Sequence, residues 1–182
     1  MKNSKILSII LRYLIVCLLG LFNLKLFYYL FGPLTVFGTG FVLGLFSNVL
    51  VFGRTIIFNS NVFEIVNACV IGSAYYLLFI LFMSFQDIRF FKRIFIILLS
   101  FFLLYVVNVL RILFLIFIFE KSYFVFAHWI FWNFVSTVFV LGIFFFIVFI
   151  FKLKEIPFQK DFLYFFRLVY QSKSKKGNVK RN

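Results

Sequence analysis

Three side chains in this sequence could carry out covalent chemistry together: the thiol of Cys69, the guanidinium of Arg111 and the imidazole of His128. A thiolate can attack a carbonyl carbon, an imidazole can carry the proton, and a guanidinium can stabilise the negative charge that develops. His128 is the only histidine in the chain, and imidazole is the side chain best suited to proton transfer near neutral pH. Together these residue types indicate a thiol-dependent acyl transfer.

The chain that carries these groups is strongly apolar. It has 182 residues, of which 65% are hydrophobic. Apolar runs of about 18 residues or more with few charges predict helices that span a membrane. We therefore expect an all-α integral membrane bundle over residues 1–151 and a basic cytoplasmic tail over residues 152–182. The tail is expected to hold an amphipathic segment, Phe158–Tyr170, and to end in disorder.

The apolar pattern predicts about four transmembrane helices. They are expected over residues 6–31, 67–85, 94–119 and 128–151. The glycine-rich residues 34–52 predict a re-entrant or interfacial helix, or a short extra span. Residues 55–66 have two β-branched and aromatic runs around Asn59-Ser60-Asn61, which predicts a small extracytoplasmic β-hairpin.

The formal net charge is +14, and nearly half of the 19 lysine and arginine residues lie at or after Lys152. Basic clusters next to a membrane exit fit anionic lipid headgroups and the cytoplasmic side of a membrane, so we expect membrane lipids and not nucleic acid as partners. The charges predict a multi-pass cell-membrane protein with both termini and the residue 86–93 loop cytoplasmic. The hairpin and the turn at residues 120–127 then face outside.

Counting along the predicted helices places the three reactive residues at one level. At about 1.5 Å per residue, Arg111 lies about 27 Å from Arg93, and Cys69 about 30 Å from Arg89. His128, expected to begin the last span, lies about 36 Å from Lys152. Because the apolar thickness of a bilayer is about 30 Å, we expect an active site at the outer face of the membrane.

Arg111 is the costliest of the three residues to place in a membrane, because a charge inside an apolar helix needs a partner or a polar cavity. Asn108 and Tyr105 lie three and six residues earlier, so the three side chains share one helix face. The alternative interpretation is that Arg111 extends to the outer headgroups as an anchor. We favour the functional interpretation, because Asn108 would be wasted in lipid.

Cys69 and His128 also have simpler interpretations, as an inert small apolar residue and as an interfacial side chain. Cys69, however, begins a predicted helix, whose dipole is expected to lower the thiol pKa, and Ser73 lies one turn later. Trp132 lies four residues after His128 on the same face. The second cysteine, Cys17, falls in mid-helix, so the sequence predicts no disulfide, no metal site and no cofactor.

The ordered set of these motifs resembles the exosortase and archaeosortase family. The motif residues are Asn67-Ala-Cys69-Val-Ile-Gly-Ser73, Asn108-Val-Leu-Arg111-Ile and Ala127-His128-Trp. The resemblance covers about residues 40–150. It is strongest to the short archaeal branch, the pacearchaeosortases, to which Gly-Ser-Ala-Tyr-Tyr at residues 72–76 is similar. Many family members have Ser or Thr and then Gly directly after the cysteine, whereas Val70 and Ile71 intervene here.

The resemblance implies a membrane transpeptidase that recognises a C-terminal sorting signal, which consists of a short motif, a transmembrane helix and a basic cluster. Such an enzyme cleaves at the motif and passes the new C-terminus to a membrane-borne lipid or to another amine or hydroxyl acceptor. By resemblance, Cys69 is the nucleophile, His128 the proton donor and Arg111 the charge stabiliser. Asn108, Ser73, Tyr105 and Trp132 are expected to support them.

A non-catalytic membrane protein, either a small transporter or an assembly subunit, is the alternative from another class. It explains the apolar composition and the basic tail, and it makes Arg111 a packing or gating charge. An intramembrane protease is disfavoured, because the sequence lacks both a paired aspartate site and a Gly-x-Ser-x-Gly motif with histidine.

Overall fold

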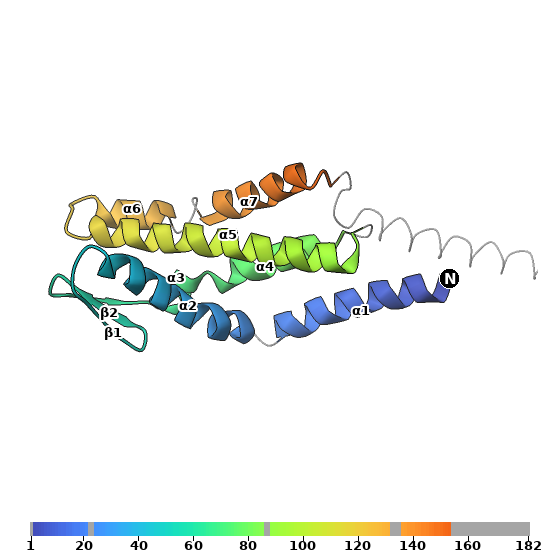
Figure 1. Ribbon diagram of the computed structural model, residues 1–182, viewed down its shortest axis with the longest axis horizontal. Helices are drawn as coiled ribbons and strands as arrows, with labels where there is room; N and C mark the ends of the chain where they lie inside the picture. The colour runs from blue at the N-terminus through green and yellow to red at the C-terminus, as the bar shows by residue number, and fades with distance from the viewer. Residues whose placement is uncertain (1, 22–23, 86–87, 132–135, 154–182) are drawn as a thin grey trace, which may run out of the picture.

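The computed structural model describes residues 2–21, 24–85, 88–131 and 136–153. Figure 1 shows an elongated helical protein with a small sheet at one end. The helices are α1 (Lys2–Leu21), α2 (Lys25–Gly44), α3 (Asn67–Val70), α4 (Gly72–Met83), α5 (Phe90–Phe117), α6 (Phe124–Ile130) and α7 (Ser136–Ile150). The strands are β1 (Val49–Phe52), β2 (Thr55–Phe58) and β3 (Asn61–Glu64).

The expected bundle of about four spans is wrong. In the described residues, two helices, α2 and α5, are long and apolar enough to cross a membrane. The other apolar stretches, which include Ile9–Leu21 of α1, are shorter. The expected first span divides into α1 and α2 at Leu24, whose φ of 57° is left-handed, and Pro33 lies inside α2 instead of ending a helix. The expected second span is divided at Ile71, which has a φ of 50°.

The glycine-rich segment at residues 34–52 forms neither a re-entrant helix nor a separate span. Its first part completes α2, and its last four residues form β1. β1 pairs with β2, and β2 with β3, so the predicted hairpin supplies the central strand and one edge strand of a three-stranded antiparallel sheet. Asn59 and Ser60 join β2 to β3 with φ angles of 49° and 64°, as a tight hairpin turn requires. The predicted amphipathic segment 158–170 lies outside the described residues.

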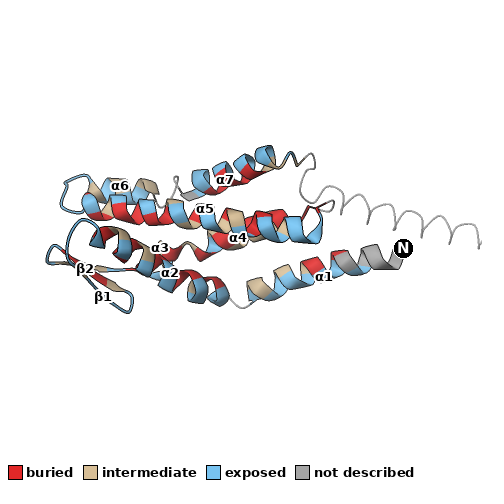
Figure 2. Cartoon of the chain, viewed as in Figure 1, coloured by how far each residue is buried: buried red, intermediate tan, exposed pale blue. Residues whose placement is uncertain are grey.

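α5 is the central element and packs against α2, α4 and α7. Beyond Lys92 in its first turn, its exposed face is apolar, whereas its buried face includes Ser100, Asn108 and Arg111. This arrangement is the reverse of a helix on the surface of a soluble protein. Figure 2 shows buried and exposed residues alternating along α5. With the length and composition of α2 and α5, the apolar outer surface favours association with a membrane.

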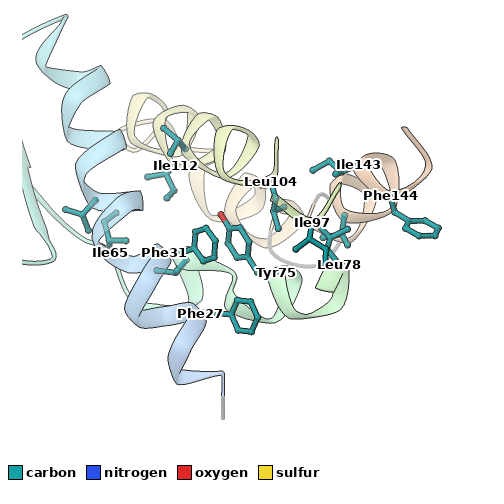
Figure 3. Close-up of a cluster of buried hydrophobic side chains, with 14 of the residues drawn as sticks. Phe27, Phe31, Ile65, Tyr75, Leu78, Ile97, Leu104, Ile112, Ile143 and Phe144 are labelled. Atoms are coloured by element: carbon teal, nitrogen blue, oxygen red, sulfur yellow. The ribbon is translucent and has the colours of Figure 1, made fainter. Parts of the chain in front are cut away.

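The core is largely aromatic where α2, α4 and α5 meet. Phe31 of α2 stacks on Tyr75 of α4 with ring centroids 3.8 Å apart, and Phe101 of α5 meets both rings edge-on. Figure 3 shows Phe31 beside Tyr75 at the centre of this cluster, with Leu104 nearby. This packing fixes α4 and α5 side by side, and α3 contacts α5 directly.

Candidate active site

Cys69 lies in α3, a single four-residue turn between β3 and α4. The Cys69 amide donates a hydrogen bond to the carbonyl oxygen of Val66 at 2.8 Å, which begins the turn. Ile71 then takes the left-handed conformation and separates α3 from α4. A helix of this length is not stable by itself, because helix nucleation is unfavourable. The position of Cys69 therefore depends on contacts with other elements.

Two side chains of α5 hold the main chain of Cys69. The Nδ2 group of Asn108 donates a hydrogen bond to the Cys69 carbonyl oxygen at 2.9 Å, and Nη2 of Arg111 donates to the same oxygen at 3.4 Å. The Asn108 bond has the usual length, and the Arg111 bond is longer. Asn108 is only 1% exposed. The predicted polar face of α5 therefore anchors the cysteine.

A third contact holds α3 at its other end. Nη1 of Arg54, in the β1–β2 turn, donates to Oδ1 of Asn67 at 2.6 Å. The carbonyl oxygen of Arg54 accepts a hydrogen bond from the amide of Ile65 at 2.9 Å. The sheet is thus linked directly to the residues that precede Cys69. This contribution of the sheet was not predicted from the sequence.

Cys69, Arg111 and His128 line one cavity of about 220 Å³. β3 forms one wall, α5 forms the second, and α6 with Phe131 forms the third. The remaining lining residues are Val62, Phe63, Glu64, Ile65, Ile112, Leu115, Ile116, Phe119, Phe124 and Phe131. The three residues that the sequence analysis singled out are therefore brought to one largely apolar cavity.

A chain of aromatic rings connects the sheet with His128 across this cavity. Phe63 of β3 meets Phe119 edge-on with ring centroids 5.1 Å apart, and Phe119 meets Phe124 at 5.2 Å. The Phe124 ring lies 6.0 Å from the His128 ring. His128 was expected to begin a helix, but it lies in the last turn of the short α6. The ring contacts, and not a helix start, place the imidazole at the cavity.

Burial raises the pKa of the Cys69 thiol, and the positive charge of Arg111 acts in the opposite direction. The expectation that a helix dipole lowers this pKa is wrong, because α3 is too short to provide a large dipole and desolvation dominates. A thiol with a raised pKa needs a base to lose its proton at neutral pH. The imidazole of His128, exposed in the same cavity, can serve as that base.

A second cavity of about 570 Å³ is lined by Asn67 and Ala68 of α3, the two residues before Cys69. Arg111 borders both cavities, whereas Ser73 borders the second cavity and not that of Cys69. The remaining lining residues come from α2, α4 and α7, together with Ile71. The structure therefore places Ser73 at a cavity that Arg111 also borders, and not at the cavity that Cys69 lines.

Of the other two expected supporting residues, Tyr105 is the one that the structure describes, and it lies outside the two cavities. Tyr105 donates its hydroxyl to the carbonyl oxygen of Leu34 at 3.0 Å and contacts Gly38, so it joins α5 to α2. Trp132 lies outside the described residues. Sequence reasoning missed Glu64 and the aromatic wall. The position of the predicted hairpin directly before Cys69 was the signal that could have placed β3 beside the thiol.

Comparisons with protein-family models, with curated proteins and with solved structures found no match for this chain. The resemblance to exosortases and archaeosortases therefore rests on the motif residues.

Proposed function

We propose that this chain is a membrane cysteine transpeptidase of the archaeosortase type. The observation that supports it best is that Cys69, Arg111 and His128 share one cavity although they lie on three different elements. Asn108 and Arg111 both donate to the carbonyl oxygen of Cys69, so the thiol-bearing turn has a defined position beside the cation. Preorganisation of this kind is what nucleophilic catalysis requires.

In the proposed reaction, His128 takes the proton of the Cys69 thiol, and the sulfur attacks a peptide carbonyl carbon of the substrate. Arg111 stabilises the oxyanion of the tetrahedral intermediate. The carbon–nitrogen bond breaks, His128 returns the proton to the departing amine, and a thioester remains on Cys69. An incoming amine or hydroxyl then attacks the thioester carbonyl carbon and loses its proton to His128. The carbon–sulfur bond breaks, and His128 returns that proton to the Cys69 thiolate.

Arg111 borders both cavities, which supports a reaction with two substrates. The first cavity would receive the peptide to be cleaved, and the second would receive the acceptor. The proposed substrates are surface proteins with a C-terminal motif, a transmembrane helix and a basic cluster. The proposed acceptor is a lipid or another membrane-borne amine or hydroxyl compound. If water alone resolves the thioester, the protein is a peptidase.

The proposed location is the cell membrane, with several passes, both termini cytoplasmic and the site at the outer face. A side-chain contact supports the common level of the hairpin and the turn after α5, because Nδ2 of Asn61 donates to Oε1 of Glu120 at 3.3 Å. Beyond the C-terminal end of α4, away from Cys69, Arg12 and Arg93 both donate hydrogen bonds to the carbonyl oxygen of Phe85. Basic side chains thus gather at the end that the topology assigns to the cytoplasm.

The decisive experiment compares Cys69→Ala with Cys17→Ser, because Cys17 is the second thiol of the chain and is exposed. Each variant is co-expressed with a protein that ends in one apolar span and a basic cluster, and cleavage is followed by the mass of the product. Cys69→Ala should abolish cleavage and Cys17→Ser should retain it. Cleavage at the wild-type rate by Cys69→Ala would remove the nucleophile and favour a non-catalytic membrane protein.

A further inference from the structure

We propose that the open edge of β3 binds the substrate main chain as an added β-strand, which delivers an extended peptide to Cys69. This inference rests on the proposed function for its substrate and specifies how that substrate is held. Adding a strand to an exposed sheet edge is a general mode of peptide recognition, in which main-chain hydrogen bonds supply the affinity.

β3 is an edge strand of the described sheet. The order is β1-β2-β3, so β2 pairs with one side of β3, and the described strands leave its other side unpaired. In an antiparallel ladder, the main-chain groups of successive residues point alternately to the two sides. The Ile65 amide donates to Arg54 on the β2 side, so Phe63 also faces β2. The N–H and C=O groups of Val62 and Glu64 therefore face outward.

The cavity lies along this edge. Val62, Phe63, Glu64 and Ile65 all line it, although successive side chains of a strand point to opposite faces of a sheet. A cavity that touches four consecutive residues therefore follows the edge of the strand and not one of its faces. The outward main-chain groups of Val62 and Glu64, two donors and two acceptors, thus border the cavity that holds the thiol.

The chain carries this edge directly to the nucleophile. Only Ile65 and Val66 separate β3 from α3, and Cys69 is the third residue of α3. A peptide paired with Val62 and Glu64 would therefore extend toward Cys69 and Arg111. The opposite wall, Phe119, Phe124 and Phe131, is aromatic, so it suits the apolar side chains of such a peptide. The occupant is thus an extended, largely apolar segment recognised through its main chain.

The test uses two electrophiles of different size on the full chain in lipid nanodiscs, in a Cys17→Ser background. One is an acetylated tetra-alanine chloromethyl ketone, and the other is chloroacetamide, which has no peptide main chain to pair. The rate of Cys69 alkylation is measured by mass spectrometry and divided by the rate of the same reagent with glutathione. The peptide reagent should show the larger normalised rate, and that ratio measures main-chain binding.

Val62→Pro removes an outward N–H group without breaking the pairing with β2. It should lower the ratio about threefold to tenfold, the effect of one lost hydrogen bond. Val51→Pro is the matched control, because Val51 has the same outward orientation on β1 at the other edge of the sheet. Val51→Pro should leave the ratio unchanged. The rate with chloroacetamide should be similar in both variants.

A peptide reagent that is N-methylated at alternate amides gives the same test on the unaltered sheet, and it decides the question if Val62→Pro does not fold. One of the two methylation patterns should lower the ratio and the other should not. An unchanged ratio with both patterns, or equal losses in Val62→Pro and Val51→Pro, would overturn the proposal. Labelling of Cys69 does not require cleavage, so this result is independent of the Cys69→Ala experiment on the proposed function.

Discussion

Replacing Gly38 by alanine should destabilise the protein through a single contact between α2 and α5. The hydroxyl of Tyr105 donates to the carbonyl oxygen of Leu34 at 3.0 Å, and a Cβ atom at Gly38 would collide with that hydroxyl. Gly38 is the residue whose amide bonds to Leu34 in the helix, four positions along. Because Gly38 lacks a side chain, the carbonyl oxygen of Leu34 can accept a second hydrogen bond.

The expected loss is about 1–3 kcal/mol in the free energy of unfolding. Overpacking costs about 1–3 kcal/mol, and loss of the tyrosine hydrogen bond costs about 0.5–1.5 kcal/mol. Alanine offsets about 1 kcal/mol of this by its better helix propensity. Unfolding in mixed detergent micelles, followed by circular dichroism, measures the difference. Gly142→Ala in α7 is the control, because its added Cβ meets nothing within 4 Å beyond the adjacent residues and backbone of its own helix, and it should lose no stability.

Tyr105→Phe removes the atom that the new methyl group meets. Gly38→Ala should therefore cost less in a Tyr105→Phe background than in the wild type. Equal costs in the two backgrounds, or a Gly38→Ala variant as stable as the wild type, would refute the argument. The same geometry recurs at α1, where Tyr76 donates to the carbonyl oxygen of Val16 at 2.9 Å and Gly20 provides the opening.

Three further predictions concern the candidate site. Arg111→Lys should reduce cleavage more than tenfold, because an ammonium group cannot reproduce the planar fork of the guanidinium; wild-type turnover would make Arg111 an anchor. Asn108→Leu removes the 2.9 Å hydrogen bond to the Cys69 carbonyl oxygen. It should therefore slow Cys69 alkylation and destabilise the fold by about 1–3 kcal/mol. An unchanged alkylation rate would show that Arg111 alone is enough to position Cys69. Because the pKa of the Cys69 thiol is raised, the rate of Cys69 alkylation should still be increasing at pH 9. Arg111 opposes this rise in pKa, so Arg111→Met should shift the pH profile of alkylation to higher pH. A plateau of the alkylation rate at neutral pH would contradict this.

The local features of the sheet and of α5 could be predicted from the sequence. β-branched and aromatic runs around Asn59 and Ser60 predicted a hairpin, and the spacing of Asn108 and Arg111 predicted a common helix face. Both depend on local periodicity, which the chain itself determines. The pairing of β1 with this hairpin was missed. The sequence before β1 is rich in glycine, and β1 is stabilised by hydrogen bonds to β2 that its own sequence does not reveal.

The helix breaks could not be predicted, because they occur at residues that normally favour regular structure. Leu24 and Ile71 both adopt left-handed φ angles, a conformation that costs a residue with a β-carbon about 1–2 kcal/mol. Tertiary contacts must compensate this cost, and they leave no sign in the local sequence. The count of about four spans failed for this reason, since continuous apolar runs were taken to be continuous helices.

Because of the break at Ile71, the position of the Cys69 thiol depends on α5 more than on α4. Asn108 and Arg111 of α5 donate hydrogen bonds to the carbonyl oxygen of Cys69. The left-handed conformation of Ile71 interrupts the helix between Cys69 and α4. If α5 slides along its axis relative to α4, the sulfur of Cys69 should move with α5. The backbone dihedral angles of Ile71 should then change to accommodate the displacement.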